Sequence, residues 1–574
     1  MSVRLRLGSS NAALDAAFDP LVARVFAHRG ITEPAQVDYQ LKQLLPYHQL
    51  KGINCAVALL VQALEAQQHI VIVGDFDCDG ATSTSLAMLA LGAMGGQNIS
   101  YLVPNRFDFG YGLSSALVDY AQASKPHLIV TVDNGISSHA GVERAHELGI
   151  KVLVTDHHLA ADTLPAADAI VNPNQPGCEF PFKSTAGVGV IFYVMSALRR
   201  ELQTQGWFEK QQITPPNMGQ YLDLVALGTV ADLVPLEHNN RILVSQGVAR
   251  IRHGKARPGL LALLNIAKRQ HHHIQASDLG FSVGPRLNAA GRLDDMSLGI
   301  ECLLSDNPQI AASLAQELDE LNGQRRNIEA DMQQQAINIL ARLETSQDEV
   351  MPKCVCLYHP DWHQGVVGIV ASRIKEKWHR PALVFAQGDD DTLKGSCRSI
   401  AGFHLRDALA AVDALNPGLI IKFGGHAMAA GLTIHADNLS VFEQALNTYT
   451  LEHLPEQLLA REWRSDGELN AHELQLNQAF ALQQAGPWGQ GFEEPTFHGR
   501  FMLVQQRIVG EKHLKLVLAH PQTGELVDAI YFNIDVAVWP NPCEQADLVY
   551  RLDVNEFRGR QSLQLMVQHM SPVL

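Results

Sequence analysis

The stretch His69-Ile-Val-Ile-Val-Gly74-Asp75-Phe-Asp77-Cys-Asp79-Gly80 decides the fold, because a short apolar run ends in three carboxylates at alternate positions. Apolar runs of the same kind recur at 100–103, 128–132, 151–155 and 169–171, and helix-like stretches separate them. Continuous apolar strands that alternate with helices are typical of a parallel sheet covered on both faces. We therefore predict an α/β fold whose parallel sheet begins near residue 69.

Polar residues follow the predicted strands where each strand ends. Open α/β sheets bind ligands at the carboxyl ends of their strands, and carboxylates this close repel one another unless a cation lies among them. Oxygen donors with one or two imidazoles suit Mg²⁺ or Mn²⁺, and a pair of such ions supports hydrolysis at phosphorus. The residues concerned are Asp75, Asp77 and Asp79, then Asp133-Asn-Gly135, then Asp156-His157-His158, and Asp232 after the apolar stretch 222–230.

Each of these fragments has a purely structural explanation when taken alone. An isolated Asp-x-Asp is commonly a turn or a capped helix start, and Asp-His-His is commonly a loop. The conjunction favours a metal centre, because three successive strands end in residues that suit a metal ion.

The rest of the chain divides by pattern. Apolar residues at helical spacing predict one long helix near 311–343, a second α/β region follows it, and five short β-like runs near the end suggest an OB-like barrel. The aromatic residues Tyr531 and Phe557 of this tail fit either a base-stacking surface or barrel core. The expected domains are 1–68 (helical segment), 69–310 (catalytic), 311–345 (connecting helix), 346–455 (α/β) and 456–574 (barrel).

Composition indicates a globular protein of several domains: 574 residues, 46% hydrophobic and 18% charged. The net charge of −16 argues against coating of nucleic acid by bulk electrostatics, but it does not exclude a nuclease whose carboxylates hold cations. None of the eight cysteines forms a CxxC pair, residues 1–14 lack a secretory apolar region, and the longest apolar run, 188–198, is too short for a bilayer. We expect a cytoplasmic protein that has no membrane partner.

In order and spacing, the three acidic motifs resemble those of the DHH phosphoesterases, and further blocks resemble the bacterial exonucleases of that family that are specific for single strands. Together these blocks cover nearly the whole chain. They are Asn105-Arg106-Phe-Asp-Phe-Gly-Tyr-Gly112, Gly284-Pro-Arg286-Leu-Asn288-Ala-Ala-Gly-Arg292, Gly365-Val-Val-Gly-Ile-Val-Ala-Ser372-Arg373 and Gly424-Gly-His426.

The resemblance implies roles for individual residues. The expected metal ligands, for two ions of Mg²⁺ or Mn²⁺, are Asp75, Asp77, Asp79, Asp133, His157 and Asp232, and His158 joins the catalytic set. The expected contacts to the substrate phosphates are Arg106, Arg286, Asn288, Ser372, Arg373 and His426.

The resemblance also implies a 5′→3′ exonuclease that releases mononucleotides from single-stranded DNA in recombination and repair. Its implied partners are a single-stranded-DNA-binding protein and a helicase, and we expect a monomer. Two alternatives stay open: another DHH phosphodiesterase that acts on short oligonucleotides, and a non-catalytic scaffold that binds single strands.

Overall fold

The structure is a computed structural model that describes residues 2–104, 112–345, 351–536 and 538–573, with residues 342–345 described by their backbone alone. The chain forms two compact units, the first comprising residues 1–319 and 463–574 and the second residues 320–462. Among the helices of the described ranges, none has the length and apolar composition needed to cross a bilayer.

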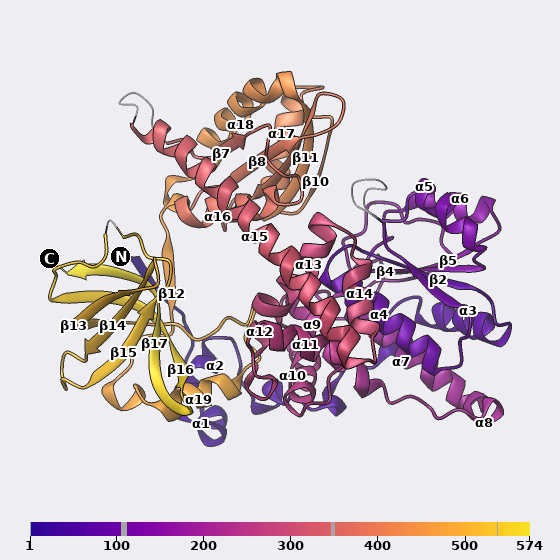
Figure 1. Cartoon of the computed structure of the whole chain (residues 1–574), viewed down its shortest axis with the longest axis horizontal. Helices are drawn as coiled ribbons and strands as arrows, with labels where there is room; N and C mark the ends of the chain where they lie inside the picture. Colours follow the sequence, from indigo (N-terminus) through magenta and orange to yellow (C-terminus); the bar gives the residue numbers. More distant parts are fainter. Residues whose placement is uncertain (1, 105–111, 346–350, 537, 574) are drawn as a thin grey trace. The chain divides into compact units, whose positions relative to one another are not determined.

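The first unit contains the parallel sheet that the sequence predicts, and its five strands lie in the order β3-β2-β4-β5-β6. Figure 1 labels β2, β4 and β5 of this sheet. The central strands are apolar and buried at almost every position because helices cover both faces of the sheet. The strands are β2 (Ile70–Gly74), β3 (Ile99–Leu102), β4 (Leu128–Val132), β5 (Lys151–Thr155) and β6 (Ala169–Val171).

Side chains on opposite faces of this sheet pack against different helices. Val71, Ile129 and Val152 share a core with α5 and α6, whereas α3, α4 and α7 contact the strands from the other side. The helices are α3 (Ile53–Glu65), α4 (Cys78–Ala93), α5 (Ser115–Ala121), α6 (His139–Glu147) and α7 (Gly187–Thr204).

A helical region continues the first unit. Its helix α9 packs against α4 and α10. Because α4 begins at the carboxyl edge of the sheet, this packing brings the end of α9 to the same edge. The helices are α8 (Trp207–Gln211), α9 (Leu222–Ala231), α10 (His238–Arg252), α11 (Pro258–Ile266), α12 (Ala276–Asp278), α13 (Gly284–Leu293) and α14 (Ser297–Leu304), with a π-helical turn η7 (Leu279–Val283) before α13.

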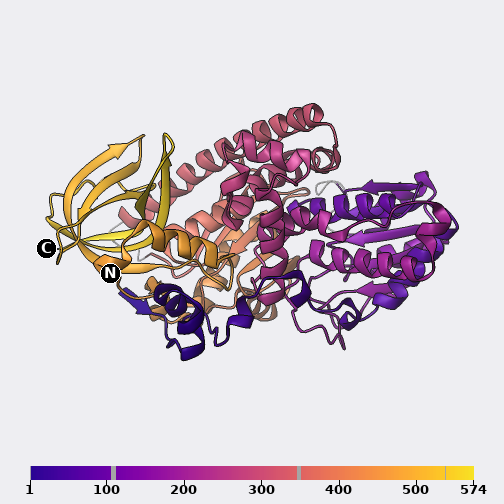
Figure 2. The same cartoon turned by 90° about the horizontal axis from the view of Figure 1, so that it is seen from below.

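The tail of the first unit is a closed five-stranded barrel, which confirms the predicted OB-like domain (Figure 2). Its strand order is β13-β14-β15-β17-β16, with β15 parallel to β17 and the other pairs antiparallel. Phe557 is 65% exposed at the turn between the last two strands and is not core. The strands are β13 (Phe497–Val509), β14 (His513–Ala519), β15 (Leu526–Tyr531), β16 (Gln545–Phe557) and β17 (Arg560–Val573).

The N-terminal residues pack on the segment that leads into this barrel, a relationship that the sequence did not predict. Strand β1 (Ser2–Leu5) pairs with β12 (Glu462–Ser465), and Arg29 donates to the buried carboxylate of Asp466 (NH2 to Oδ2, 3.0 Å). The remaining helices here are α1 (Ala12–Ala17), α2 (Pro20–Ala27) and α19 (Leu476–Ala485).

The second unit is the predicted second α/β region, entered through the predicted long helix, α15 (Pro308–Thr345). Its sheet has the order β10-β11-β9-β8-β7, in which only β7 and β8 are parallel. The elements are β7 (Val355–Tyr358), α16 (Val367–Trp378), β8 (Ala382–Gln387), β9 (Thr392–Arg398), α17 (Leu405–Leu415), β10 (Lys422–Gly425), β11 (Ala429–His435) and α18 (Leu439–His453).

Candidate metal centre

The carboxyl ends of β2, β4 and β5 lie side by side, because these strands are neighbours in a parallel sheet. The chain leaves β2 through Asp75 and enters α4, whose first backbone amides donate to Asp77 Oδ1, from Asp79 at 2.9 Å and from Gly80 at 3.0 Å. Asp77 is therefore a helix cap, and its second oxygen is left for another ligand.

All six predicted metal ligands and His158 come together at this edge. Within each of three groups of residues, the ligand atoms lie within 4.8 Å of one another. The groups are Asp75 with Asp77 and Asp133, Asp79 with His157 and Asp232, and Asp133 with His157 and His158.

The imidazole of His157 lies among three carboxylates. Its Nε2 is 3.1 Å from Asp133 Oδ1, 3.5 Å from Asp232 Oδ2 and 3.9 Å from Asp79 Oδ2. Asp133 is almost fully buried, and 24% of the Asp232 side chain is exposed. The cluster is therefore accessible to solvent at Asp232 and at His158, whose side chain is 38% exposed.

Asp133 has an unusual backbone conformation, with φ at +63°. Such a conformation is costly outside glycine and is kept where the surrounding structure holds it. The amide of Asn134, the next residue, donates to Val73 O at 3.0 Å and to Val132 O at 2.9 Å, so it ties the ends of β2 and β4 together. A Cβ on Gly187 would lie 2.6 Å from Asp133 Oδ1, so only glycine fits opposite this carboxylate.

Asp79 is fixed by the start of α7. The backbone amides of Gly187 and Val188 donate to its two oxygens at 2.7 and 2.9 Å, and a helix N-terminus favours a negative charge at this position. A Cβ on Gly228 would lie 2.7 Å from Asp79 Oδ1, so α9 approaches this carboxylate through a glycine.

Asp156 is buried at the same edge of the sheet and holds neighbouring residues through hydrogen bonds. Its Oδ1 accepts from Nδ1 of His158 at 2.7 Å and from the backbone of His157 at 2.7 Å, and its Oδ2 accepts from the backbone of Ile136 at 2.9 Å. It therefore orients both histidines and holds the loop that carries Asp133.

Burial and mutual repulsion make the charged form of these carboxylates costly. Burial and the charge of Asp77 raise the pKa of Asp79 to about 7, and burial and the charge of Asp79 raise the pKa of Asp133 and of Asp232 well above the ordinary range. A divalent cation would offset this repulsion, and oxygen donors with one imidazole are the donor set that Mg²⁺ and Mn²⁺ accept. The residues present therefore fit these ions.

The predicted phosphate contacts in the first unit have structural partners of their own. Arg286 Nε donates to Asp319 Oδ1 at 2.8 Å, and Asn288 Oδ1 accepts from the backbone of Cys78 at 2.7 Å, which connects α13 to the start of α4. Arg106 lies outside the described residues.

The predicted contacts in the second unit lie on α16 and in the turn between β10 and β11. Ser372 Oγ donates to Gly368 O at 3.2 Å, and Arg373 bonds to Glu329 at 2.9 Å and to Glu376 at 3.3 Å while remaining partly exposed. His426 is exposed in its turn, where its backbone amide donates to Ala429 O at 2.8 Å.

Family models match three parts of the chain. Residues 69–229 match the DHH family N-terminal domain, residues 351–452 the DHHA1 domain and residues 465–569 the RecJ OB domain. The single-stranded-DNA-specific exonuclease RecJ of Escherichia coli is 54% identical over the whole chain and 99% of that relative. The chain belongs to the RecJ family. RecJ of Bacillus subtilis is 32% identical over 96% of the chain and 67% of that relative.

Solved RecJ structures share the fold. The crystal structure of RecJ in complex with Mn²⁺ from Thermus thermophilus aligns with a TM-score of 0.80 at 29% identity, over the whole chain and 80% of that structure. The Mg²⁺ complex of the same RecJ aligns with a TM-score of 0.74 at 28% identity, over the whole chain and 79% of that structure. Membership of the DHH phosphoesterases, inferred from the acidic motifs, is confirmed.

Sequence reasoning did not identify several residues that shape the site. Asp156 was visible as the first residue of its motif, but its role as an acceptor required the fold. Asn134, Gly187 and Gly228 carry no chemical pattern, since their contribution is a backbone bond or the absence of a side chain. Asn134 and Gly135 follow Asp133 directly, and this adjacency was the available signal.

Proposed function

We propose that the chain is a metal-dependent exonuclease that hydrolyses single-stranded DNA from its 5′ end and releases mononucleotides. The observation that carries the proposal is the convergence of Asp75, Asp77, Asp79, Asp133, His157 and Asp232 at one sheet edge. Full-length similarity to exonucleases named as specific for single-stranded DNA supports the substrate. The polarity follows from the family resemblance.

The ligands proposed for two ions of Mg²⁺ or Mn²⁺ are these six residues. When bound, such ions supply Lewis-acid activation of water and stabilise charge on the phosphate oxygens. The carboxylates hold this centre in a buried site, where electrostatic stabilisation is stronger than in water.

His158 is the group proposed to move a proton. Burial opposes its protonation, but the hydrogen bond to Asp156 and the surrounding carboxylates outweigh burial and raise the pKa of His158 to about 9. Because Nδ1 is bonded to Asp156, Nε2 is the nitrogen through which His158 would donate to the departing 3′ oxygen. Arg106, Arg286, Asn288, Ser372, Arg373 and His426 are proposed to contact the phosphates of the strand.

The cellular setting is also a proposal: a cytoplasmic monomer that acts in DNA recombination and repair beside a single-stranded-DNA-binding protein and a helicase. The barrel supplies a domain of the type that binds single strands.

Digestion of labelled DNA tests the proposal. Single-stranded DNA labelled at the 5′ or the 3′ end is incubated with the protein and Mn²⁺ or Mg²⁺, next to the same sequence as a blunt duplex. We expect early release of the 5′ label as a mononucleotide, gradual shortening of the 3′-labelled strand and little digestion of the duplex. Faster hydrolysis of a dinucleotide than of a long strand would favour the other DHH phosphodiesterases, and binding without hydrolysis would favour a scaffold.

A further inference from the structure

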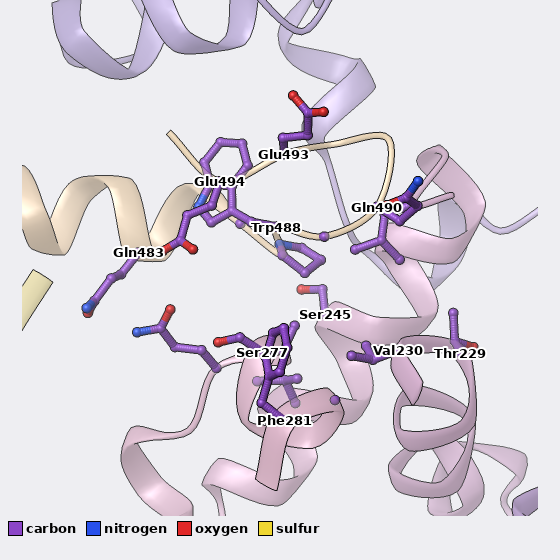
Figure 3. Close-up of a pocket in the computed structure, with 18 of the residues that line it drawn as sticks. Thr229, Val230, Ser245, Ser277, Phe281, Gln483, Trp488, Gln490, Glu493 and Glu494 are labelled. Atoms are coloured by element: carbon purple, nitrogen blue, oxygen red, sulfur yellow. The ribbon is translucent and has the colours of Figure 1, made fainter. Parts of the chain in front are cut away.

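A cavity of about 380 Å³ lies within the first unit, beside the chain segment that carries Asp232 (Figure 3). One wall comes from α9, α10, α12 and the π-helical turn η7, and the other from the end of α19 and residues 486–494 before the barrel. Figure 3 shows Val230, Ser277 and Phe281 on the first wall and Trp488, Glu493 and Glu494 on the second.

The two walls are held together by direct contacts. The backbone amide of Leu236 donates to Gln490 O at 2.7 Å, and the guanidinium of Arg241 lies 4.2 Å from the centre of the Phe492 ring. A Cβ on Gly489 would lie 2.7 Å from Leu236 Cδ1, so the loop needs glycine to come this close. The cavity is therefore preformed and does not require closure around a ligand.

The lining combines an apolar surface with available amides. Phe281 is 81% exposed, which is unusual for a phenylalanine, and it lies in a π-helical turn, a feature frequent at functional sites. In the part of the chain that the structure describes, the side-chain amides of Gln484 and Gln490 have no hydrogen-bond partner. An aromatic face with nearby amides suits a flat ligand that has donors and acceptors along its edge.

The charges of the lining balance. Arg551 is paired with Glu494, Glu493 is paired with Arg6, and Arg252 lies in the field of Asp278. Because these charges already have partners, a phosphate would gain little in such a site, whereas an uncharged heterocycle needs no charge partner.

The position relative to the metal centre selects the ligand class. Asp232 lies between Val230 and Leu233, which both line the cavity, so the same short segment contributes to the metal centre and to the cavity wall. A strand that holds a phosphodiester at Asp232 would therefore run beside the segment that forms this wall of the cavity.

We propose that the cavity binds one unstacked nucleobase of the strand being digested, with its face on Phe281 and its edge toward Gln484 and Gln490. The inference rests on the proposed function and deepens it, since it assigns a base-binding subsite next to the metal centre. The site has no fixed donor pattern, so we expect tolerance of all four bases.

An abasic scan tests the proposal. Anisotropy measures the affinity of the full chain for 5′-phosphorylated 20-mers in EDTA, with one abasic nucleotide moved stepwise from the 5′ end. We compare wild type, Phe281→Ala and a control, Leu415→Ala, which removes a 74% exposed side chain from the second unit. For wild type and the control we expect one or two adjacent positions where the missing base weakens binding by about 5- to 100-fold, the range of base stacking on aromatic residues.

In Phe281→Ala, we expect weaker binding of the intact strand and no further loss at those positions. If the abasic profile of Phe281→Ala matches that of wild type, the base does not stack on Phe281 and the subsite is wrong. Hydrolysis of the intact strand with Mn²⁺ is measured in parallel. Failure of wild type to hydrolyse it would overturn the proposed function, whereas hydrolysis with an unchanged abasic profile overturns only the subsite.

Discussion

The buried carboxylate of Asp156 accepts a hydrogen bond from Nδ1 of His158 at 2.7 Å, and the His158 side chain is 38% exposed. The other oxygen of Asp156 holds the backbone of Ile136, three residues beyond Asp133. One side chain thus fixes both the proposed proton donor and the loop that carries a proposed metal ligand.

Replacing Asp156 by asparagine should lower the turnover number. An amide cannot accept hydrogen bonds at both ends, so either His158 or Ile136 loses its partner. We expect kcat to fall by about 10- to 100-fold, the usual effect of removing such a supporting group, with a smaller change in KM. The matched control is Asp168→Asn, because Asp168 also pairs with a histidine (His146, 3.0 Å) and a backbone amide (Val152, 2.8 Å), outside the cluster. If kcat were equal in the two variants, Asp156 would not support catalysis by holding His158 and Ile136.

Adding one methyl group at Gly228 should disturb the metal centre. The new Cβ would lie 2.3 Å from Thr82 Oγ1 and 2.7 Å from Asp79 Oδ1, so the carboxylate must move. We expect Gly228→Ala to weaken Mn²⁺ binding, measured by calorimetry, and to lower the free energy of unfolding by about 1–3 kcal/mol.

The control is Gly92→Ala in α4, where a Cβ meets nothing within 4 Å. Alanine there should leave Mn²⁺ binding unchanged and add about 0.5–1 kcal/mol of stability, since it stiffens an exposed helix position. Wild-type Mn²⁺ affinity in Gly228→Ala would mean that Asp79 does not contribute to the site.

The stabilising effect of Mn²⁺ should increase with pH. The pKa of Asp79 is about 7, above the value of about 4 for an unfolded aspartate, so the metal-free folded chain binds the proton more tightly and loses stability as pH rises between these values. A bound cation removes this cost. We therefore expect a larger rise in Tm on adding Mn²⁺ at pH 8 than at pH 5.5, by differential scanning fluorimetry.

Asp232→Asn provides the comparison for this effect. Removing one repelling charge should raise the Tm of the metal-free chain at pH 8 and reduce the shift that Mn²⁺ produces. A Tm shift that does not depend on pH in wild type would show that these carboxylates are not the titrating groups.

The contact between Arg29 and Asp466 should hold the N-terminal residues against the barrel segment. Burial opposes ionisation of Asp466, but hydrogen bonds from His28 and Arg29 outweigh it and keep the pKa of this carboxyl far below its usual range. Its contribution to stability is therefore present above about pH 4 and is lost as pH falls below that value. Asp466→Asn leaves Arg29 buried without its charge partner, at a cost of about 3–5 kcal/mol.

Limited proteolysis measures this effect. We expect trypsin to cleave near residues 24–29 faster in Asp466→Asn than in wild type at pH 7.5. The control Asp547→Asn breaks an exposed pair with Arg500 and should leave the cleavage rate unchanged. Equal cleavage in all three proteins would show that the contact does not secure the N-terminus.

The parallel sheet and the cluster were predictable because their evidence is local. Each strand from β2 to β6 is a short apolar run, and the ends of β2, β4 and β5 carry polar residues. Once the strands are taken as parallel neighbours, these ends must meet. The barrel was predictable for a similar reason, since alternation such as Leu514, Leu516 and Leu518 marks strands that are buried on one face.

Other features depend on contacts between segments that are far apart in the sequence. Strand β1 has only four residues, too few for the alternation of Val3 and Leu5 to mark a strand, and its partner β12 lies more than 450 positions away. The positive φ of Asp133 and the glycine contacts of Gly187 and Gly228 follow from how α7 and α9 reach the sheet edge. Arg373 looked available for a phosphate in sequence, but its ion pairs with Glu329 and Glu376 required the fold.

The Asp133→Ala variant tests the metal centre most directly, because it should lose hydrolysis and keep strand binding. The rate of mononucleotide release from 5′-phosphorylated single-stranded DNA with Mn²⁺ is measured beside the affinity for the same strand in EDTA. We expect hydrolysis below detection, reduced Mn²⁺ binding by calorimetry and an affinity for DNA close to that of wild type. Hydrolysis at the wild-type rate by a folded Asp133→Ala protein would contradict the assignment of this cluster as the catalytic centre.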